Sequence, residues 1–455
     1  MQVINAREAL LPDGWHKDVQ IEIAPDGRVG SIATNTNLNG QVIDLVLPAP
    51  VNLHSHAFQR AMSGLTEARG PDASDSFWTW RTLMYRFLDQ LDPDQIEAIA
   101  ALVFMEMLEA GYAGVCEFHY LHHAIAGAHY DTKSELSERV ISAAQRAGIG
   151  LTLVPVLYRF GGCDARPLKG GQRRFGNTPD QFQRVFEGAK KALGRAPNDY
   201  AIATSAHSLR AVDHSGLTFA AVLAPDRPFH MHLAEQHAEV DEVMAHWGAR
   251  PVQWLLDNHA VDGRWCLIHC TQMTAQETRD LAGSGAVAGL CPITESNLGD
   301  GVFNGVDYLG AGGKIGVGSD SNVHISLFEE LKTLEYSQRL RDNSRASLAS
   351  ADRSSGRRIY EDVLIGGAQA AGRNTGAIKV GMQADLVGLA GDNHWLCNRA
   401  GDTALDTLIF GGHGQDCITD VWSAGRHMVR DGRHIARDAI TRDFVKVVTA
   451  LVATG

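Results

Sequence analysis

A repeated alternation of apolar strands and helices constrains the fold of this chain more than any other feature. Several candidate strands are continuous apolar runs, which is typical of parallel strands covered on both faces. Helical patterns lie between them: one begins at Asp92-Pro93, another begins at Thr178-Pro179, and a third runs from Glu235 to Trp247 and ends at Gly248. The candidate strands are Leu47–Leu53, Val115–Tyr120, Leu151–Leu157, Ala201–Ser205, Pro228–Leu233, Trp265–His269, Ala286–Leu290 and Lys314–Gly318.

This alternation predicts an α/β fold with a (β/α)8 TIM-type barrel. A doubly wound open sheet is the alternative. It is less favoured, because no glycine-rich phosphate-binding pattern follows the first strand.

Both ends of the chain contain short strands that could not bury a core alone. They include Val19–Ile23, Val29–Ile32 and Ala384–Leu389. We therefore expect one small composite β-sandwich domain built from both ends. The predicted organisation is 1–46 and 376–440 for this domain, 47–375 for the barrel and 441–455 for a C-terminal helix.

Composition and charge exclude several classes of partner. The net charge is -12, and no run of lysine or arginine indicates nucleic-acid binding. No uninterrupted apolar stretch could span a membrane, and the N-terminus lacks a signal-peptide pattern. The seven cysteines are scattered and lack CxxC spacing, which favours a reduced cytoplasm. The sequence does not decide between a monomer and a homodimer.

Metal-ligand residues recur at the ends of the predicted strands. His54 and His56 end the first strand and share one face, because alternate side chains of a strand point the same way. His232, His269 and Asp320 end three other strands. Singly, each histidine could be a core residue and Asp320 a helix cap. Because catalytic groups of such barrels lie at these strand ends, the joint pattern predicts a metal centre.

The motifs HSH, HLAE, the strand-six histidine and GSDS, with the split end domain, resemble the amidohydrolase superfamily. The resemblance implies His54, His56, His232 and Asp320 as metal contacts, with His269 beside the reacting water. Binuclear members usually carry a carboxylated lysine on strand four, and YAIATSAHS has none. We therefore expect one divalent metal ion, and zinc is the first candidate.

Glu235 lies three residues after His232, at the strand-to-helix turn. In deaminase branches of the superfamily such a glutamate carries protons to the nitrogen under attack. The resemblance thus implies Glu235, His269 and Asp320 as the catalytic residues. The alternative is a glutamate that only stabilises the N-terminus of a helix.

Polar residues near strand ends suggest a carboxylate substrate. Arginines bind carboxylates through two parallel hydrogen bonds, although each could also be a surface ion-pair partner. Arg81 lies in a tryptophan-rich segment that could close over the site. The candidate substrate-binding residues are Gln59, Arg81, Tyr120, His207 and Arg210.

A closer resemblance, to the formiminoglutamate deiminase family of histidine degradation, extends from end to end. It is carried by NLHSHAFQRAMSGL, DSFWTWRTLMYR, EFHYLHH, GQRRF, HSLRAV, HLAEQ, TESNLGDGVF and GSDSNVHISLFEELKTLEYSQRLR. It implies hydrolysis of N-formimino-L-glutamate, a small dicarboxylate, to N-formyl-L-glutamate and ammonia. One alternative is a deaminase of a nucleobase or another cyclic amidine, which would need aromatic stacking. A remote alternative is a non-catalytic binding protein with a vestigial metal site.

Overall fold

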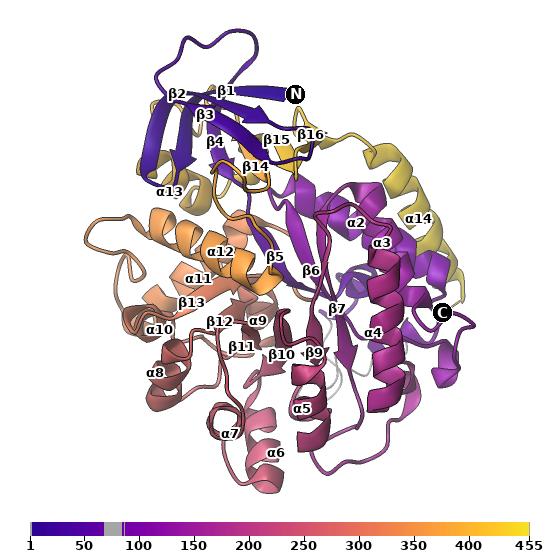
Figure 1. Ribbon diagram of the computed structural model, residues 1–455. Helices are drawn as coiled ribbons and strands as arrows, with labels where there is room; N and C mark the ends of the chain where they lie inside the picture. The colour runs from indigo at the N-terminus through magenta and orange to yellow at the C-terminus, as the bar shows by residue number, and fades with distance from the viewer. Residues whose placement is uncertain (1, 68–83, 86, 455) are drawn as a thin grey trace.

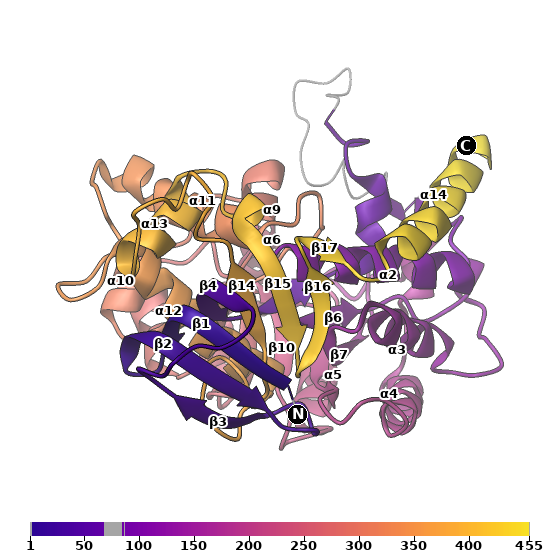
Figure 2. The same ribbon diagram turned by 90° about the horizontal axis from the view of Figure 1, so that it is seen from above.

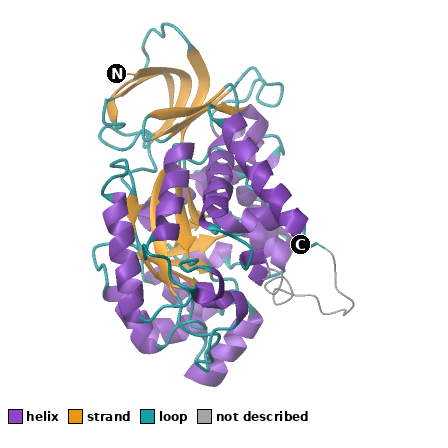
Figure 3. Ribbon diagram, turned by 90° about the vertical axis from the view of Figure 1, so that its right-hand side faces the viewer, coloured by secondary structure: helices purple, strands orange, loops and turns teal. Residues whose placement is uncertain are grey.

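Parallel strands form the central sheet of the protein, and helices surround it (Figures 1 and 3). The computed structural model describes residues 2–67, 84–85 and 87–454. The strands of this nine-stranded sheet are β5 (Val51–Ser55), β6 (Gly114–His119), β7 (Gly150–Leu157), β8 (Ala201–Ile202), β9 (Thr204–Ala206), β10 (Phe229–Leu233), β11 (Trp265–His269), β12 (Val287–Leu290) and β13 (Lys314–Val317).

The sheet closes between β5 and β13, next to the predicted metal ligands. Asp320 N donates to His54 O at 2.9 Å, and His56 N donates to Asp320 O at the same distance. A parallel bridge joins Ser55 to Asp320. The predicted barrel is therefore confirmed, and its closure fixes the backbone of two strand ends at the site.

Helices cover the outer face of the barrel, which explains why most of its strands are buried on both faces. As the sequence predicted, Asp92 and Thr178 cap two of these helices, and Gly248 ends a third. The helices are α2 (Pro93–Glu109), α3 (Glu135–Ala147), α4 (Pro179–Leu193), α5 (His214–Val222), α6 (His237–Trp247), α7 (Pro251–Asn258), α8 (Ala275–Gly283), α9 (Pro292–Leu298), α10 (Gly305–Gly310), α11 (Leu327–Asp342), α12 (Ser355–Ala371) and α13 (Asp402–Phe410).

The two ends of the chain share a second, mixed sheet, which Figure 2 shows with indigo and yellow strands side by side. Within it, β4 pairs with β1 on one side and with β14 on the other. This confirms that both termini build one small unit. In sheet order, its strands are β17 (Arg433–His434), β16 (Arg426–Arg430), β15 (Ile418–Ser423), β14 (Leu386–Leu389), β4 (Val42–Pro48), β1 (Gln2–Leu11), β2 (Gly14–Ile23) and β3 (Val29–Ala33).

Two predicted strands are each divided into two in the structure, and others differ from it by about one residue at an end. The run Leu47–Leu53 is divided between β4 and β5, because Pro48 and Pro50 have no N–H to continue a ladder. The run Ala201–Ser205 is divided into β8 and β9, which both pair with β7.

The C-terminal helix α14 (Arg437–Thr454) packs beside α2 (Figure 2). It begins four residues before the expected start at 441. The division into domains at 46/47, 375/376 and 440/441 remains a proposal. Within the described part of the chain, no helix combines the length and apolar character needed to cross a membrane.

Candidate metal centre and active-site pocket

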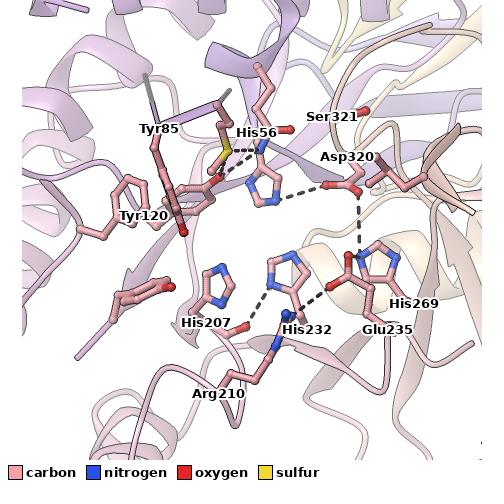
Figure 4. A pocket seen from close by; sticks show the side chains of 15 residues that line it. His56, Tyr85, Tyr120, His207, Arg210, His232, Glu235, His269, Asp320 and Ser321 are labelled. Carbon is pink, nitrogen blue, oxygen red and sulfur yellow. Dashed lines mark hydrogen bonds and ion pairs between the residues drawn. The ribbon is translucent and has the colours of Figure 1, made fainter. Parts of the chain in front are cut away.

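Four buried side chains converge at the carboxyl end of the barrel strands, and Figure 4 shows three of them, His56, His232 and Asp320. His54 lies on β5 and His56 directly follows it, His232 lies on β10, and Asp320 follows β13. His54 Nε2 lies 3.2 Å from His56 Nε2 and 3.1 Å from His232 Nε2. Asp320 Oδ1 lies 3.5 Å from His54 Nε2 and 3.2 Å from His56 Nε2. The four residues form a buried metal-binding site.

The spacing within this group fits a single cation. All four ligand atoms lie within 4.8 Å of one another. Four-coordinate zinc, with Zn–N distances of about 2.0 to 2.1 Å, holds its ligand atoms about 3.3 to 3.4 Å apart. Imidazole nitrogens with one carboxylate oxygen are also a donor set that suits divalent zinc.

Backbone carbonyls fix the orientation of two of the rings. His56 Nδ1 lies 3.1 Å from Phe118 O, and His232 Nδ1 lies 3.0 Å from His207 O. A carbonyl can only accept, so each contact places the ring proton on Nδ1. The lone pair of Nε2 then faces the site, which is the arrangement that metal-ligating histidines use.

Burial and mutual contacts also set the charge of these groups. Burial lowers the pKa of His54 to about 3 and lowers the pKa of His56. Burial would raise the pKa of Asp320, but its hydrogen bond with His54 and the charge of His56 hold that pKa below its usual value. Neutral imidazoles and an ionised carboxylate are the forms that bind a cation.

Three residues around the site adopt a backbone conformation that L-amino acids rarely use. The angle φ is +73° at His269, +45° at Asp320 and +52° at Ala234. A non-glycine residue in such a region costs about 1 to 3 kcal/mol, and surrounding contacts must hold it. The kink at Ala234 separates β10 from α6, so α6 begins at His237 rather than at Glu235 as predicted.

His269 and Glu235 lie beside the metal group. His269 Nε2 is 3.8 Å from Glu235 Oε1 and 3.9 Å from Asp320 Oδ2. On the other side of the ring, Nδ1 lies 3.2 Å from Glu295 Oε1, which also accepts the N–H of Cys291. Burial opposes a charged ring, but the three carboxylates raise the pKa of His269 to about 10. His269 can therefore face Asp320 as a proton donor.

Arg210 is buried between two carboxylates. Its Nη2 atom lies 3.0 Å from Glu235 Oε2 and 3.7 Å from Glu239 Oε2. Burial disfavours the charged guanidinium, but Glu239 and Glu235 raise the pKa of Arg210 above its usual value. The arginine expected to bind a substrate carboxylate thus also holds the side chain of Glu235 (Figure 4).

Four of the five predicted substrate-binding residues line the same pocket: Gln59, Tyr120, His207 and Arg210. Gln59 Nε2 donates to the Tyr120 hydroxyl at 2.9 Å. Arg81 lies outside the described residues, as does the tryptophan-rich segment expected to close over the site.

Several pocket residues were missed from the sequence. Tyr85 and Tyr158 line the pocket, and Gln172 Nε2 joins their hydroxyl groups at 3.1 and 3.4 Å. Tyr85 belongs to the segment DSFWTWRTLMYR, one of the motifs that carry the family resemblance, so its sequence position could have indicated a place in the site. The other residues missed are Met84, Phe175, Leu298 and Ser321.

Two family models match the chain. The model described as the amidohydrolase family matches residues 45–428. The model described as the N-terminal domain of formimidoylglutamate deiminase HutF matches residues 1–41. Together they account for both the barrel and the first strands of the end sheet.

Known proteins resemble the whole chain. A formimidoylglutamate deiminase from Pseudomonas aeruginosa is 47% identical over 458 residues, which cover 99% of this chain and 100% of that protein. An amidohydrolase from Brucella melitensis has a similar crystal structure, with 45% identity, a TM-score of 0.95 and coverage of 99% and 100%. An adenosine deaminase from Xanthomonas campestris, with bound zinc, shares the fold at 19% identity and a TM-score of 0.83, with coverage of 99% and 98%.

Proposed function

The chain belongs to the amidohydrolase family and, within it, to the formimidoylglutamate deiminases, and from this premise we propose its full reaction. It hydrolyses N-formimino-L-glutamate to N-formyl-L-glutamate and ammonia, in cytoplasmic histidine degradation. The observation that carries the proposal is the joint placement of Glu235, His269 and Arg210 beside the four metal ligands.

The metal in this proposal is one zinc ion, held by His54, His56, His232 and Asp320. The zinc-bound adenosine deaminase of the same fold supports this choice. When bound, zinc lowers the pKa of water from about 15.7 towards about 7, which supplies a nucleophile at neutral pH.

Proton transfer falls to Asp320, His269 and Glu235. Asp320 accepts a proton as water attacks the formimino carbon, and His269, 3.9 Å from Asp320 Oδ2, orients that carboxylate. Glu235 delivers a proton to the terminal nitrogen. The carbon–nitrogen bond then breaks with ammonia as the leaving group, because a neutral amine leaves far more readily than an amide ion.

The glutamate part of the substrate is bound by Arg210 and by polar residues that line the same pocket. Arg210 offers a buried guanidinium to one carboxylate, while His207, Tyr120 and Gln59 offer further hydrogen-bonding groups. Arg81 is the proposed partner of the second carboxylate. Such contacts hold the formimino carbon over the metal and convert binding energy into orientation.

Turnover of N-formimino-L-glutamate by the zinc-loaded protein tests the proposal when the products are identified. Formylglutamate with ammonia is the expected pair, whereas glutamate with formamide would show that the other carbon–nitrogen bond breaks. Glu235→Gln is expected to keep zinc and lose about 100-fold or more of kcat. Full activity in that variant would show that Glu235 does not transfer the proton. Turnover of cyclic amidines but not of N-formimino-L-glutamate would show that the proposed substrate is wrong.

A further inference from the structure

Glu239 is a buried acid that the proposed reaction leaves without a task. It lies in the first turn of α6 with 0% of its surface exposed, and burial raises the pKa of its carboxyl group. A charge at such a position is costly unless fixed partners compensate it. The structure supplies these partners from the backbone that carries Glu235 and from Arg210.

Both oxygens of the Glu239 carboxylate accept backbone N–H groups of the kink after β10. Oε1 lies 3.3 Å from Ala234 N, and Oε2 lies 3.0 Å from Glu235 N. Ala234 is the residue with φ at +52°. Because alanine seldom adopts this conformation, hydrogen bonds to the two amides stabilise the kink. Glu239 therefore determines where the Glu235 side chain leaves the backbone.

The carbonyl side of the same kink is held by the segment after β11. The Thr271 hydroxyl lies 2.6 Å from Glu235 O and 3.2 Å from Ala234 O. Gln272 N also donates to Ala234 O at 2.9 Å. With Glu239 on the amides and Thr271 on the carbonyls, the kink is fixed from both neighbouring segments.

Glu239 also shares Arg210 with Glu235. Arg210 Nη2 lies 3.7 Å from Glu239 Oε2 and 3.0 Å from Glu235 Oε2. Under the proposed function, Glu235 exchanges a proton during each turnover, so its interaction with Arg210 changes. Glu239 takes no part in that exchange and keeps one carboxylate beside the buried guanidinium throughout the cycle.

We propose that Glu239 is a positioning residue that fixes Glu235 and Arg210 in one reactive arrangement. The inference rests on the proposed proton-transfer role of Glu235. It requires no contact between Glu239 and the substrate, so it concerns the rate of turnover rather than substrate binding.

The isosteric variant Glu239→Gln tests the inference, because an NH2 group, which only donates, replaces one of the two oxygens that accept the separate N–H groups of Ala234 and Glu235. We expect kcat for N-formimino-L-glutamate to fall about 10- to 100-fold, as when a partner that orients a catalytic group is removed. KM should stay unchanged or fall, because Arg210 loses one competitor for the substrate carboxylate. Glu242→Gln is the matched control: it lies on the same helix, contacts Cys163 and Arg166, and should keep both constants.

A second substitution distinguishes positioning from general packing. Glycine adopts positive φ without the cost that alanine bears. Adding Ala234→Gly to Glu239→Gln should therefore restore kcat several-fold, roughly what a 1 kcal/mol cost removed at φ +52° would give. Rescue of kcat at unchanged metal content supports the inference.

Other outcomes overturn it. A wild-type kcat in Glu239→Gln does so, as does a loss of kcat matched by a loss of bound metal. If Glu239→Gln does not fold, Thr271→Val decides: a lower kcat at unchanged metal content supports the inference, and a wild-type kcat overturns it. Glu235→Gln, measured in parallel, separates the two proposals, since an inactive Glu235→Gln beside a fully active Glu239→Gln removes only the role of Glu239.

Discussion

In the part of the chain that the structure describes, two histidine clusters lie near strand ends of the barrel, and of these two only one is arranged to hold a metal. The metal group takes His54 from β5, His56 from the position after β5 and His232 from β10, and adds Asp320. The second cluster begins at the last residue of β6 and consists of His119, His122, His123 and His129. Three members of the second cluster are buried as deeply as the metal ligands, so burial does not distinguish the two.

The two clusters differ in which ring nitrogen meets a carbonyl. In the second cluster, His122 Nε2 lies 2.9 Å from Val156 O and His123 Nε2 lies 2.9 Å from Gly176 O. His129 Nδ1 lies 3.1 Å from His123 Nδ1. In the metal group, the carbonyls occupy Nδ1 of His56 and His232 instead.

This difference in ring orientation explains why one group of neighbouring histidines can bind a metal and the other cannot. Carbonyl contacts on Nδ1 leave the Nε2 lone pairs pointing to one centre, whereas carbonyl contacts on Nε2 consume that nitrogen. The metal group also has a carboxylate, and within the described residues no carboxylate is among the hydrogen-bond partners of the second cluster. Ring orientation and one negative charge therefore separate the clusters.

The largest expected effect comes from removing one ligand of the metal group. His232→Ala should lose the metal and lower kcat/KM by about 10³-fold or more, since metal catalysis contributes several kcal/mol. His122→Gln is the control in the second cluster, because an amide can still donate to Val156 O. Metal analysis per protein chain and turnover check both variants; metal loss in the control would break the distinction between the clusters.

The next effect concerns a carboxylate contact that the second cluster lacks. Glu295→Gln weakens the hold on His269 Nδ1, 3.2 Å away, and should lower kcat about 10- to 100-fold with little change in KM. Glu330→Gln is the matched control, because this buried carboxylate accepts the N–H of Ile293 nearby. Steady-state kinetics decides: equal losses in both variants would mean that the effect is not specific to His269.

The barrel and the positions of the metal ligands could be predicted from the sequence. Alternation of strand and helix predicted the barrel, because each segment follows local periodicity and capping that Asp92, Thr178 and Gly248 still show in the structure. The HSH spacing predicted a shared face for two ligands for the same local reason. The break between β4 and β5 was also readable from Pro48 and Pro50, but the continuous apolar run masked it.

Other parts of the site depend on contacts between distant segments. Gln172 reaches Tyr85 across 87 positions and Tyr158 across 14, and no periodicity indicates that these groups meet. The positive φ of Ala234 is set by hydrogen bonds from α6 and from the segment after β11. Alanine gives no local sign of such a kink, which is why α6 was expected to begin at Glu235.

A smaller effect is expected from the second cluster in acid. Burial lowers the pKa of His119 from 6.5 to about 3. Between these values the unfolded chain binds a proton that the folded protein does not, so the free energy of unfolding decreases as pH falls. At about 1.4 kcal/mol per pH unit, this amounts to about 2 kcal/mol between pH 7 and pH 5.

His119→Phe removes this proton and should flatten the decrease. Urea unfolding of both proteins at pH 7 and pH 5, with metal in excess, measures the difference. If both proteins lose the same stability between pH 7 and pH 5, His119 does not contribute to the pH dependence. The pKa of its ring is then less perturbed than the pKa values of the histidines in the metal group.

The smallest expected effect comes from giving the second cluster the charge it lacks. Asn177 Oδ1 lies 3.0 Å from His123 Nε2, and burial followed by the charge of His129 lowers the pKa of His123. Asn177→Asp places a carboxylate at nearly the same distance and should raise that pKa, as Glu295 helps to do for His269. NMR titration of the His123 ring reports the change. The metal content of the protein should stay unaltered, because His123 Nε2 still faces Gly176 O and therefore does not point to a centre shared with the other rings. If this variant binds an additional metal ion, charge rather than ring orientation separates the two clusters.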